Sequence, residues 1–339
     1  MVLFRVDANE QVASGHLMRC ISIAKEVRNM GEEVFFVLAQ NKFTERLVEE
    51  NIPFEVLHSD WMDLYGELSK ISKVVQQKKP RWIVVDSYQA EEDYLSQLQH
   101  WKNVLYMDDL AKDIYRVAAV VHYADWEQES KYGLNYEDSN TKVLCGMKYV
   151  PLREEFYPEE GQATKRILIT TGGSDGYNVA GRLLRKLCAE PELEDYRFAT
   201  VVGALNANKN ELQQLAKEKS QIDLLFDVHD MGDQMRKSQI AISAGGTTLF
   251  ELCACRVPTV CFSMAENQES LAKAMGKHGV MTYAGDARFN LEQLVDNLSK
   301  EIRRLVVEEQ LQQDYKQKMS SLVDGQGARR IARLLVEGN

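Results

Sequence analysis

The regular alternation of short apolar runs with amphipathic stretches is the feature that most limits how this 339-residue chain can fold. Such alternation is typical of βα units that build a parallel sheet. In the first half we predict strands at 3–6, 33–38, 54–57, 82–85, 104–107 and 118–122. In the second half we predict them at 167–171, 198–202, 223–226, 240–243, 259–262 and 280–283. Both halves are therefore expected to have an α/β fold.

A proline- and charge-rich stretch interrupts this alternation between Pro151 and Gly161, as an interdomain linker does. The chain length also suits two domains of ordinary size. We predict an N-terminal Rossmann-like domain at 1–152, a linker at 153–164 and a C-terminal Rossmann-like domain at 165–315. We expect the chain to be helical from about Glu308, with a break at Gly325–Gly327, and a terminal helix at 316–339 to pack back on the first domain. Two such domains imply a cleft between them.

The charge distribution excludes some classes of partner. The chain has 41 basic and 51 acidic residues, and its whole deficit of −10 lies in residues 1–160. Nucleic acids and anionic membranes require clustered positive charge, so we expect neither as a partner. No apolar run approaches the ~18 residues of a membrane span, and Asp7 and Glu10 interrupt any leader-like start. With six cysteines and no CxxC pair, we expect a reduced, cytoplasmic protein.

Three strand-to-helix turns contain glycine, and the first also contains a histidine. Ser14 and Gly15 are expected to allow a tight turn, which places His16 at the start of the following helix. The positive end of the helix dipole disfavours imidazolium, so we expect His16 to be neutral near pH 7. A neutral histidine at a strand's carboxyl end can serve as a general base. The alternative is a buried histidine that only hydrogen-bonds at the helix start.

The other two turns each contain a Gly-Gly pair. They comprise Gly172, Gly173, Ser174 and the nearby Asn178, and Gly245, Gly246, Thr247, Thr248 and the later Glu251. Free amides at a helix start bind phosphate, and glycine lets the phosphate approach the backbone. Glu251 lies one turn after Thr247, where a carboxylate can accept hydrogen bonds from ribose hydroxyls. Two such turns in one domain favour a nucleotide site, although Gly-Gly turns also occur as simple connections.

Other polar residues also follow predicted strands. Asp7 and Tyr88 fall where residues of a cleft are expected, and the amides of Asn267 and Gln268 suit sugar hydroxyls. The alternative for this amide pair is a polar turn that caps a helix. The pair Asp108-Asp109 is better explained as a cap and a solvated charge than as a metal site. We therefore expect no metal.

Eight motifs, in order, resemble those of the PseG-type UDP-sugar hydrolases and especially their spore-coat polysaccharide relatives, called SpsG. The motifs are Arg5-Val-Asp7, Ser14-Gly-His-Leu-Met-Arg19-Cys20, Val85-Asp-Ser-Tyr88, Met107-Asp-Asp-Leu110, Gly146-Met-Lys-Tyr149 with Leu152-Arg-Glu-Glu-Phe156, Gly172-Gly-Ser-Asp175, Ala244-Gly-Gly-Thr-Thr-Leu-Phe-Glu251 and Glu266-Asn-Gln268. That family is similar to MurG-like glycosyltransferases. The resemblance therefore implies the GT-B fold, with two Rossmann-like domains and an interdomain cleft.

The resemblance also implies an activity. It is the metal-independent, cofactor-free hydrolysis of a UDP-linked 2,4-diacetamido-2,4,6-trideoxy sugar, with release of UDP, on the route to pseudaminic acid or a spore-coat polysaccharide. Carried over by position, it assigns water activation to His16, sugar contacts to Tyr88 and Asn267, diphosphate contacts to Gly173, Ser174, Gly246, Thr247 and Thr248, and the ribose to Glu251. UDP is a good leaving group, so one base and an anion site suffice.

Two alternatives remain at this point. A glycosyltransferase of the same fold would move the sugar to a soluble acceptor, and the acidic first half argues against docking on a membrane. A catalytically silent protein would only bind the nucleotide sugar.

Overall fold

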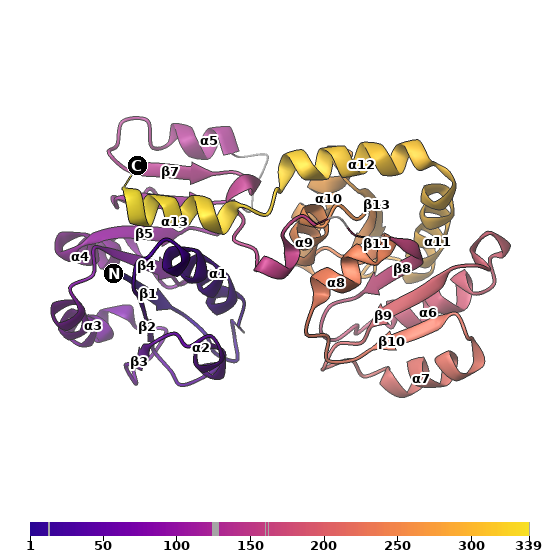
Figure 1. The fold of residues 1–339 in the computed structure, drawn as a ribbon, viewed down its shortest axis with the longest axis horizontal. Helices are drawn as coiled ribbons and strands as arrows, with labels where there is room; N and C mark the ends of the chain where they lie inside the picture. Colours follow the sequence, from indigo (N-terminus) through magenta and orange to yellow (C-terminus); the bar gives the residue numbers. More distant parts are fainter. Residues whose placement is uncertain (13, 124–128, 160, 162, 339) are drawn as a thin grey trace. The chain divides into compact units, whose positions relative to one another are not determined.

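The computed structural model describes residues 1–12, 14–123, 129–159, 161 and 163–338. By its internal contacts the chain divides into two compact units. The first comprises residues 1–154 and 325–339, and the second comprises residues 155–324. Both chain ends belong to the first unit (Figure 1).

The first unit is built on a seven-stranded parallel sheet in the order β3-β2-β1-β4-β5-β6-β7. Its elements are β1 (Val2–Val6), α1 (Gly15–Asn29), β2 (Val34–Leu38), α2 (Glu45–Glu49), β3 (Phe54–Val56), α3 (Leu64–Lys78), β4 (Trp82–Asp86), α4 (Glu92–Trp101), β5 (Asn103–Met107), β6 (Ala119–His122), α5 (Glu129–Leu134), β7 (Lys142–Cys145) and the 3₁₀ turn η2 (Met147–Tyr149). The central strands are buried along their whole length, which explains why they are continuous apolar runs.

The second unit has a six-stranded parallel sheet in the order β10-β9-β8-β11-β12-β13. Its elements are β8 (Thr164–Thr170), α6 (Val179–Leu187), η4 (Pro191–Leu193), β9 (Arg197–Val201), α7 (Lys209–Glu218), β10 (Ile222–Leu225), α8 (Met231–Arg236), β11 (Ser238–Ala244), α9 (Thr248–Ala254), β12 (Thr259–Ser263), α10 (Glu266–Lys277), β13 (Thr282–Asp286), α11 (Leu291–Val307) and α12 (Glu309–Leu322). Apolar side chains of α6 and α11 pack on the sheet in one continuous core.

The helical end of the chain is divided at the Gly325–Gly327 break that the sequence predicts, so the expected helix at 316–339 is split in two. Two helices lie there, because the chain turns at Gly325, whose φ of +77° is a conformation that glycine adopts without strain. The first, α12, belongs to the second unit. The second, α13 (Gly327–Glu337), belongs to the first unit and packs against α1.

The boundary between the units also differs from the expected linker. A short 3₁₀ turn, η3 (Glu154–Phe156), lies there, and Phe156 is fully buried rather than exposed as in a flexible connection. Residues 160 and 162 of the expected linker lie outside the described residues.

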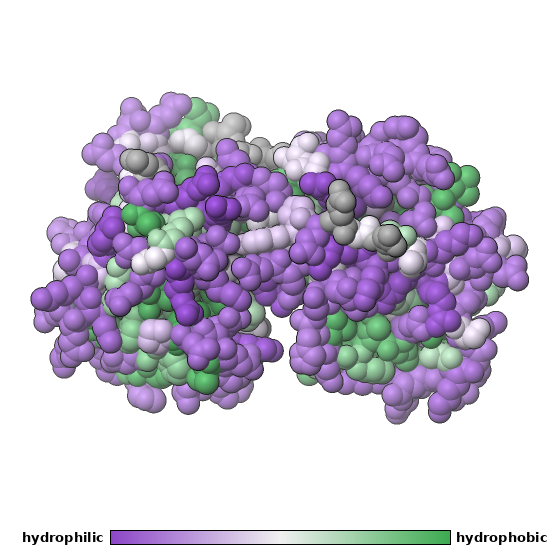
Figure 2. Space-filling view, in the orientation of Figure 1, coloured by the Kyte–Doolittle hydropathy of each residue, from purple (hydrophilic) through white to green (hydrophobic). Residues whose placement is uncertain are grey.

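On the face drawn in Figure 2, hydrophilic side chains cover most of the surface of each unit, and apolar side chains form small patches. Within the described part of the chain, no helix has the length and apolar character that a membrane span requires.

Candidate functional site

Polar side chains gather at the carboxyl ends of β1 and β4 in the first unit. The sheet order reverses between these two adjacent strands, and in open α/β sheets ligands bind outside the strand ends at such a point. Asp7 follows β1, Asp86 ends β4, and His16 is the second residue of α1. The register Val6↔Asp86 brings the two strand ends side by side.

His16 is buried, with its side chain only 7% exposed. Its Nδ1 lies 3.4 Å from Asp86 Oδ1, and its Nε2 lies 3.9 Å from Asp109 Oδ2. Tyr88 meets the imidazole edge to face, with ring centroids 4.5 Å apart. The structure thus places a carboxylate beside each ring nitrogen, a feature that the sequence did not reveal.

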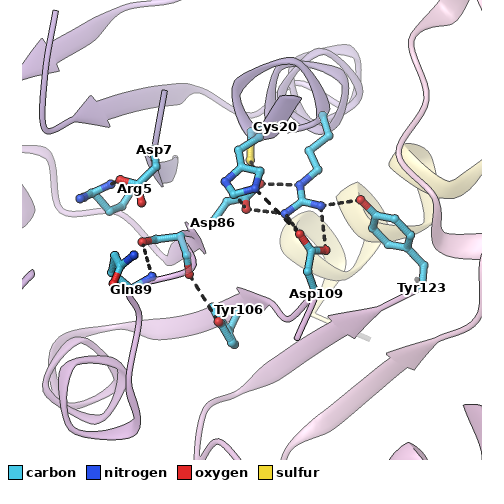
Figure 3. A network of polar contacts seen from close by, with 11 residues as sticks. Arg5, Asp7, Cys20, Asp86, Gln89, Tyr106, Asp109 and Tyr123 are labelled. Carbon is cyan, nitrogen blue, oxygen red and sulfur yellow. Dashed lines mark hydrogen bonds and ion pairs between the residues drawn. The ribbon is translucent and has the colours of Figure 1, made fainter. Parts of the chain in front are cut away.

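Arg19, one turn after His16 on α1, connects the two carboxylates. Its Nε and Nη2 donate to Asp86 at 2.6 and 2.5 Å, and its Nη1 and Nη2 donate to Asp109, both at 2.8 Å. Its Nη1 also donates to the Tyr123 hydroxyl at 2.5 Å. Figure 3 shows Asp86, Asp109 and Tyr123 converging on one region beside Cys20. The two carboxylates are thus fixed by one planar guanidinium.

This pairing sets the charge states of the cluster. Burial acts to raise the pKa of the Asp86 carboxyl, but Arg19 and His16 outweigh it, and the pKa lies below its usual value. Burial acts to lower the pKa of Arg19, and Asp86, Tyr123 and Asp109 raise it well above normal instead. Burial, followed by Asp109, raises the pKa of the half-exposed Tyr88 hydroxyl. We therefore treat Asp86 as ionised, Arg19 as charged and Tyr88 as neutral near pH 7.

One ligand atom each from His16, Asp86 and Asp109 lies within 4.8 Å of the others, a donor set that would suit a divalent metal. Both carboxylates, however, already accept two hydrogen bonds each from Arg19. The guanidinium supplies the positive charge that an ion would bring, so we assign no metal to this cluster.

The carboxylate of Asp7 is turned toward Arg5 (Figure 3). Asp7 is 1% exposed, and its Oδ1 accepts a 2.7 Å hydrogen bond from Arg5, which also binds Glu67. Its Oδ2 is buried without a hydrogen-bond partner. The expected contact of Asp7 with a substrate therefore rests on a single oxygen atom.

Gly15 and the acidic pair after β5 differ from expectation. Gly15 has no left-handed φ, and a Cβ added to it would meet nothing within 4 Å, so the turn does not require glycine. Asp108 caps a turn by accepting from the amides of Leu110 and Ala111. Asp109 is not a solvated charge, because Arg19 binds both its oxygens.

In the second unit, the first Gly-Gly turn follows β8 at the point where the sheet order reverses between β8 and β11. Gly172, Gly173 and Ser174 are exposed there. The helix start behind them is occupied, because the buried Asp175 carboxylate accepts hydrogen bonds from the amides of Val179 and Ala180. The expectation of free amides at this helix start was wrong. Any anion must use the turn itself.

Two further residues shape this turn. Asn178 donates from Nδ2 to Glu211 on α7, so part of its amide is used within the unit. Gly203, after β9, faces the turn so closely that a Cβ there would lie 2.4 Å from the carbonyl oxygen of Gly173 and 2.6 Å from that of Gly172. Gly203 was not predicted from the sequence, because a lone glycine after a strand does not indicate a close contact with another turn.

The second Gly-Gly turn lies between β11 and α9. Gly245 is buried, Gly246 and Thr248 are half-buried, and Thr247 is exposed. The N-cap residue Thr247 makes no side-chain capping hydrogen bond to α9, whereas Asp175 accepts from the first amides of α6. Glu251 is half-buried on α9, one turn after Thr247.

The amide pair at the start of α10 lies beside this turn. A Cβ on Gly245 would be 2.6 Å from the backbone oxygen of Gln268, so the glycine allows α10 to approach. The Gln268 side chain accepts from the Met264 amide at 3.1 Å, which is the capping role named as the alternative. Asn267 is exposed.

The pairing of Arg19 with Asp109 was not predicted from the sequence. The spacing of Arg19 from His16, three positions along one helix, was the available signal, because residues i and i+3 share a helix face. Nothing local could identify its partner Asp109, which lies 90 positions away.

Comparison with known proteins gives the following relatives. Residues 167–331 match the model of the glycosyltransferase family 28 C-terminal domain. Spore coat polysaccharide biosynthesis protein SpsG of Bacillus subtilis is 24% identical over 78% of this chain and 79% of its own length. The UDP-2,4-diacetamido-2,4,6-trideoxy-beta-L-altropyranose hydrolase of Campylobacter jejuni is 24% identical over 82% of this chain and 97% of its own length.

An uncharacterised protein of Methanocaldococcus jannaschii is 27% identical over 77% of this chain, and the match spans about half of that protein, 55%. Among solved structures, MurG of Acinetobacter baumannii superposes with a TM-score of 0.67 at 14% identity over 99% of both chains. At that identity the likeness establishes the fold alone.

These findings confirm two predictions, the family resemblance and the fold class. The chain resembles the PseG-type UDP-sugar hydrolases and their SpsG relatives, and it has the two-domain α/β fold of the MurG-like, GT-B glycosyltransferases.

Proposed function

We propose that this protein is a nucleotide-sugar hydrolase that releases UDP from a UDP-linked diacetamido-trideoxy sugar. The observation that carries the proposal is the buried His16 at the switch point of the first sheet, with a carboxylate facing each ring nitrogen. The Campylobacter jejuni hydrolase, which matches this chain over 97% of its own length, supports the choice of reaction and substrate. The proposed context is the synthesis of a pseudaminic acid-like sugar or a spore-coat polysaccharide.

In this proposal His16 removes a proton from water, and the water oxygen attacks the anomeric carbon. The bond from that carbon to the β-phosphate oxygen breaks, and its electron pair leaves with UDP. Tyr88 and Asn267, both exposed, are proposed to contact the sugar. The exposed turn Gly172–Ser174, together with Gly246, Thr247 and Thr248, would stabilise the diphosphate charge, and Glu251 would bind the ribose. No metal or cofactor has a step in this scheme.

Glycosyl transfer is the second candidate, favoured by the match of residues 167–331 to a glycosyltransferase domain. The fold serves both reactions, because only the nucleophile differs. A protein that binds nucleotide sugars without turnover is the third.

The test incubates the protein with the proposed UDP-sugar in the absence of any acceptor and measures the released UDP with a coupled assay. We expect turnover by the wild-type protein and a loss of about 10²–10⁴-fold in kcat for His16→Asn, with UDP affinity retained. His100→Asn, an exposed substitution on α4, is the matched control and should retain full activity. Turnover that appears only with an added acceptor would identify a transferase. Equal activity of His16→Asn and wild type would contradict the role of His16.

A further inference from the structure

Asp109 is more confined than an ordinary surface carboxylate. It follows β5, its side chain is 17% exposed, and both its oxygens accept 2.8 Å hydrogen bonds from Arg19. Its Oδ2 also lies 3.9 Å from His16 Nε2. That spacing is too long for a hydrogen bond but suits one water between the two atoms, since two hydrogen bonds of about 2.8 Å can span it.

The opposite side of the imidazole faces the other carboxylate. Asp86 Oδ1 is 3.4 Å from His16 Nδ1, and Asp86 is held by Arg19 Nε and Nη2. Of the two carboxylates, Asp86 lies nearer to the ring, so we assign the ring proton to Nδ1 and the lone pair to Nε2, the atom that faces Asp109.

We propose that Asp109 holds the attacking water together with His16 Nε2, and that Arg19 is the positioning residue that fixes Asp109 and Asp86 on the two sides of the imidazole. This inference rests on the proposed function and adds to it the group that orients the nucleophile. It explains why one arginine makes four hydrogen bonds to two carboxylates from separate strands.

Water donates one hydrogen bond to Asp109 Oδ2 and its other proton to His16 Nε2, and its oxygen bonds to the anomeric carbon. The leaving UDP takes the electron pair of the broken bond, and His16 later returns its proton to solvent. The charged groups that face the ring are Asp86, Asp109 and Arg19, so the cluster goes from a net charge of −1 to neutral when His16 is protonated.

A competing explanation is that Asp109 only stabilises the fold by pairing with Arg19. The two roles differ in their dependence on His16. If Asp109 acts through the water that His16 activates, its removal has no further effect once His16 is gone, because residues that act as a unit are not additive. A purely structural role would lower residual activity or stability in either background.

The experiment measures kcat and KM for UDP release by wild type, Asp109→Asn, His16→Asn and the double variant. We expect Asp109→Asn to lower kcat about 10–100-fold with KM and UDP affinity unchanged, and the double variant to match His16→Asn. Asp113→Asn, an exposed carboxylate on the same connection, is the matched control and should retain wild-type kinetics. Wild-type kcat in Asp109→Asn, or a further loss in the double variant, overturns the proposal.

Arg19→Lys provides a second, independent variant. Lysine keeps the charge but lacks the planar fork that binds both carboxylates, so we expect a loss of about tenfold in kcat, with Arg28→Lys on the same helix as the unaffected control. Wild-type kcat in Arg19→Lys overturns the positioning role of Arg19. Wild-type protein that releases no UDP overturns the proposed function itself, whereas active wild type with an active Asp109→Asn overturns only the role of Asp109.

Discussion

The substitution Gly203→Ala should displace the first Gly-Gly turn, which belongs to the second unit, and leave the structure of the first unit unchanged. Gly203 follows β9, and Leu205, two residues later, donates its amide to the carbonyl oxygen of Gly173 at 3.1 Å. A methyl group on Gly203 would lie 2.4 Å from that oxygen and 2.6 Å from the oxygen of Gly172. Both contacts are with backbone atoms, so a side-chain rotation cannot relieve them.

The magnitude follows from these distances. Real Cβ atoms essentially never approach closer than 3.0 Å, so one of the two loops must move by at least about 0.6 Å. Overpacking of this kind costs about 1–3 kcal/mol of folding free energy. Because the displaced turn is the proposed diphosphate site, we also expect UDP affinity to fall by about tenfold, which corresponds to about 1.4 kcal/mol.

Urea unfolding gives the change in stability, and isothermal titration with UDP gives the change in affinity. Gly176→Ala is the matched control. Gly176 lies in the connection between β8 and α6 that also contains the first Gly-Gly turn, but a Cβ there meets nothing within 4 Å. The control should retain the wild-type unfolding free energy. If Gly203→Ala were as stable as wild type, the steric argument would be refuted. A destabilised variant with unchanged UDP affinity would separate the turn from the nucleotide site.

Two other substitutions test the buried charges of the first unit. The pKa of Asp86 is lower in the folded protein than its usual 3.8, so its ionisation adds stability above that pH, and this stability is lost as the pH falls through the lower, folded-state pKa. The difference in unfolding free energy between wild type and Asp86→Asn should therefore be largest above about pH 4 and become smaller in more acidic buffer. A difference that stays constant from about pH 2 to 7 would contradict the stabilising role of the Asp86 charge. Glu67 is fully buried and accepts hydrogen bonds from Arg5 at 2.6 and 3.0 Å. Glu67→Gln should therefore lower the unfolding free energy measured in urea by about 3–5 kcal/mol. A loss under about 1 kcal/mol would show that Asp7 alone balances the charge of Arg5.

Most of the architecture was predictable from the sequence. A buried parallel strand is a continuous apolar run, which can be recognised without knowing which strands lie beside it. The strand at Lys142–Cys145 was missed, since it is only four residues long and its ends are half-buried or exposed. The last strand was expected at 280–283 but runs from Thr282 to Asp286, where a glycine and an aspartate conceal the pattern. Local hydropathy fails where a strand lies at the edge of its sheet.

The candidate site was predictable to the extent that it follows from strand ends. His16, Asp86 and Asp7 each follow or end a strand that the sequence identified, and adjacent parallel strands bring their carboxyl ends together. The pairing of Arg19 with Asp109 was not predictable, because it depends on the position of β5 in the sheet order and on the direction of α1. Asp7 illustrates the same limit, since its carboxylate is directed by Arg5, a residue inside the strand.

The two Gly-Gly turns of the second unit look equivalent in sequence, yet the structure makes them chemically different. At the first, Asp175 already occupies the amides of α6, so a phosphate would find only the exposed turn, with a carboxylate of the same charge behind it. Burial raises the pKa of Asp175 above its usual value, although the amide hydrogen bonds from Ala180 and Val179 act in the opposite direction. At the second, the N-cap residue Thr247 makes no side-chain capping hydrogen bond, and the amides of Leu249 and Phe250 donate to the carbonyl oxygens of Gly246 and Thr247. A carboxylate at a helix start disfavours a second anion there, so we expect the larger share of diphosphate stabilisation in the proposed reaction to fall to Gly246, Thr247 and Thr248.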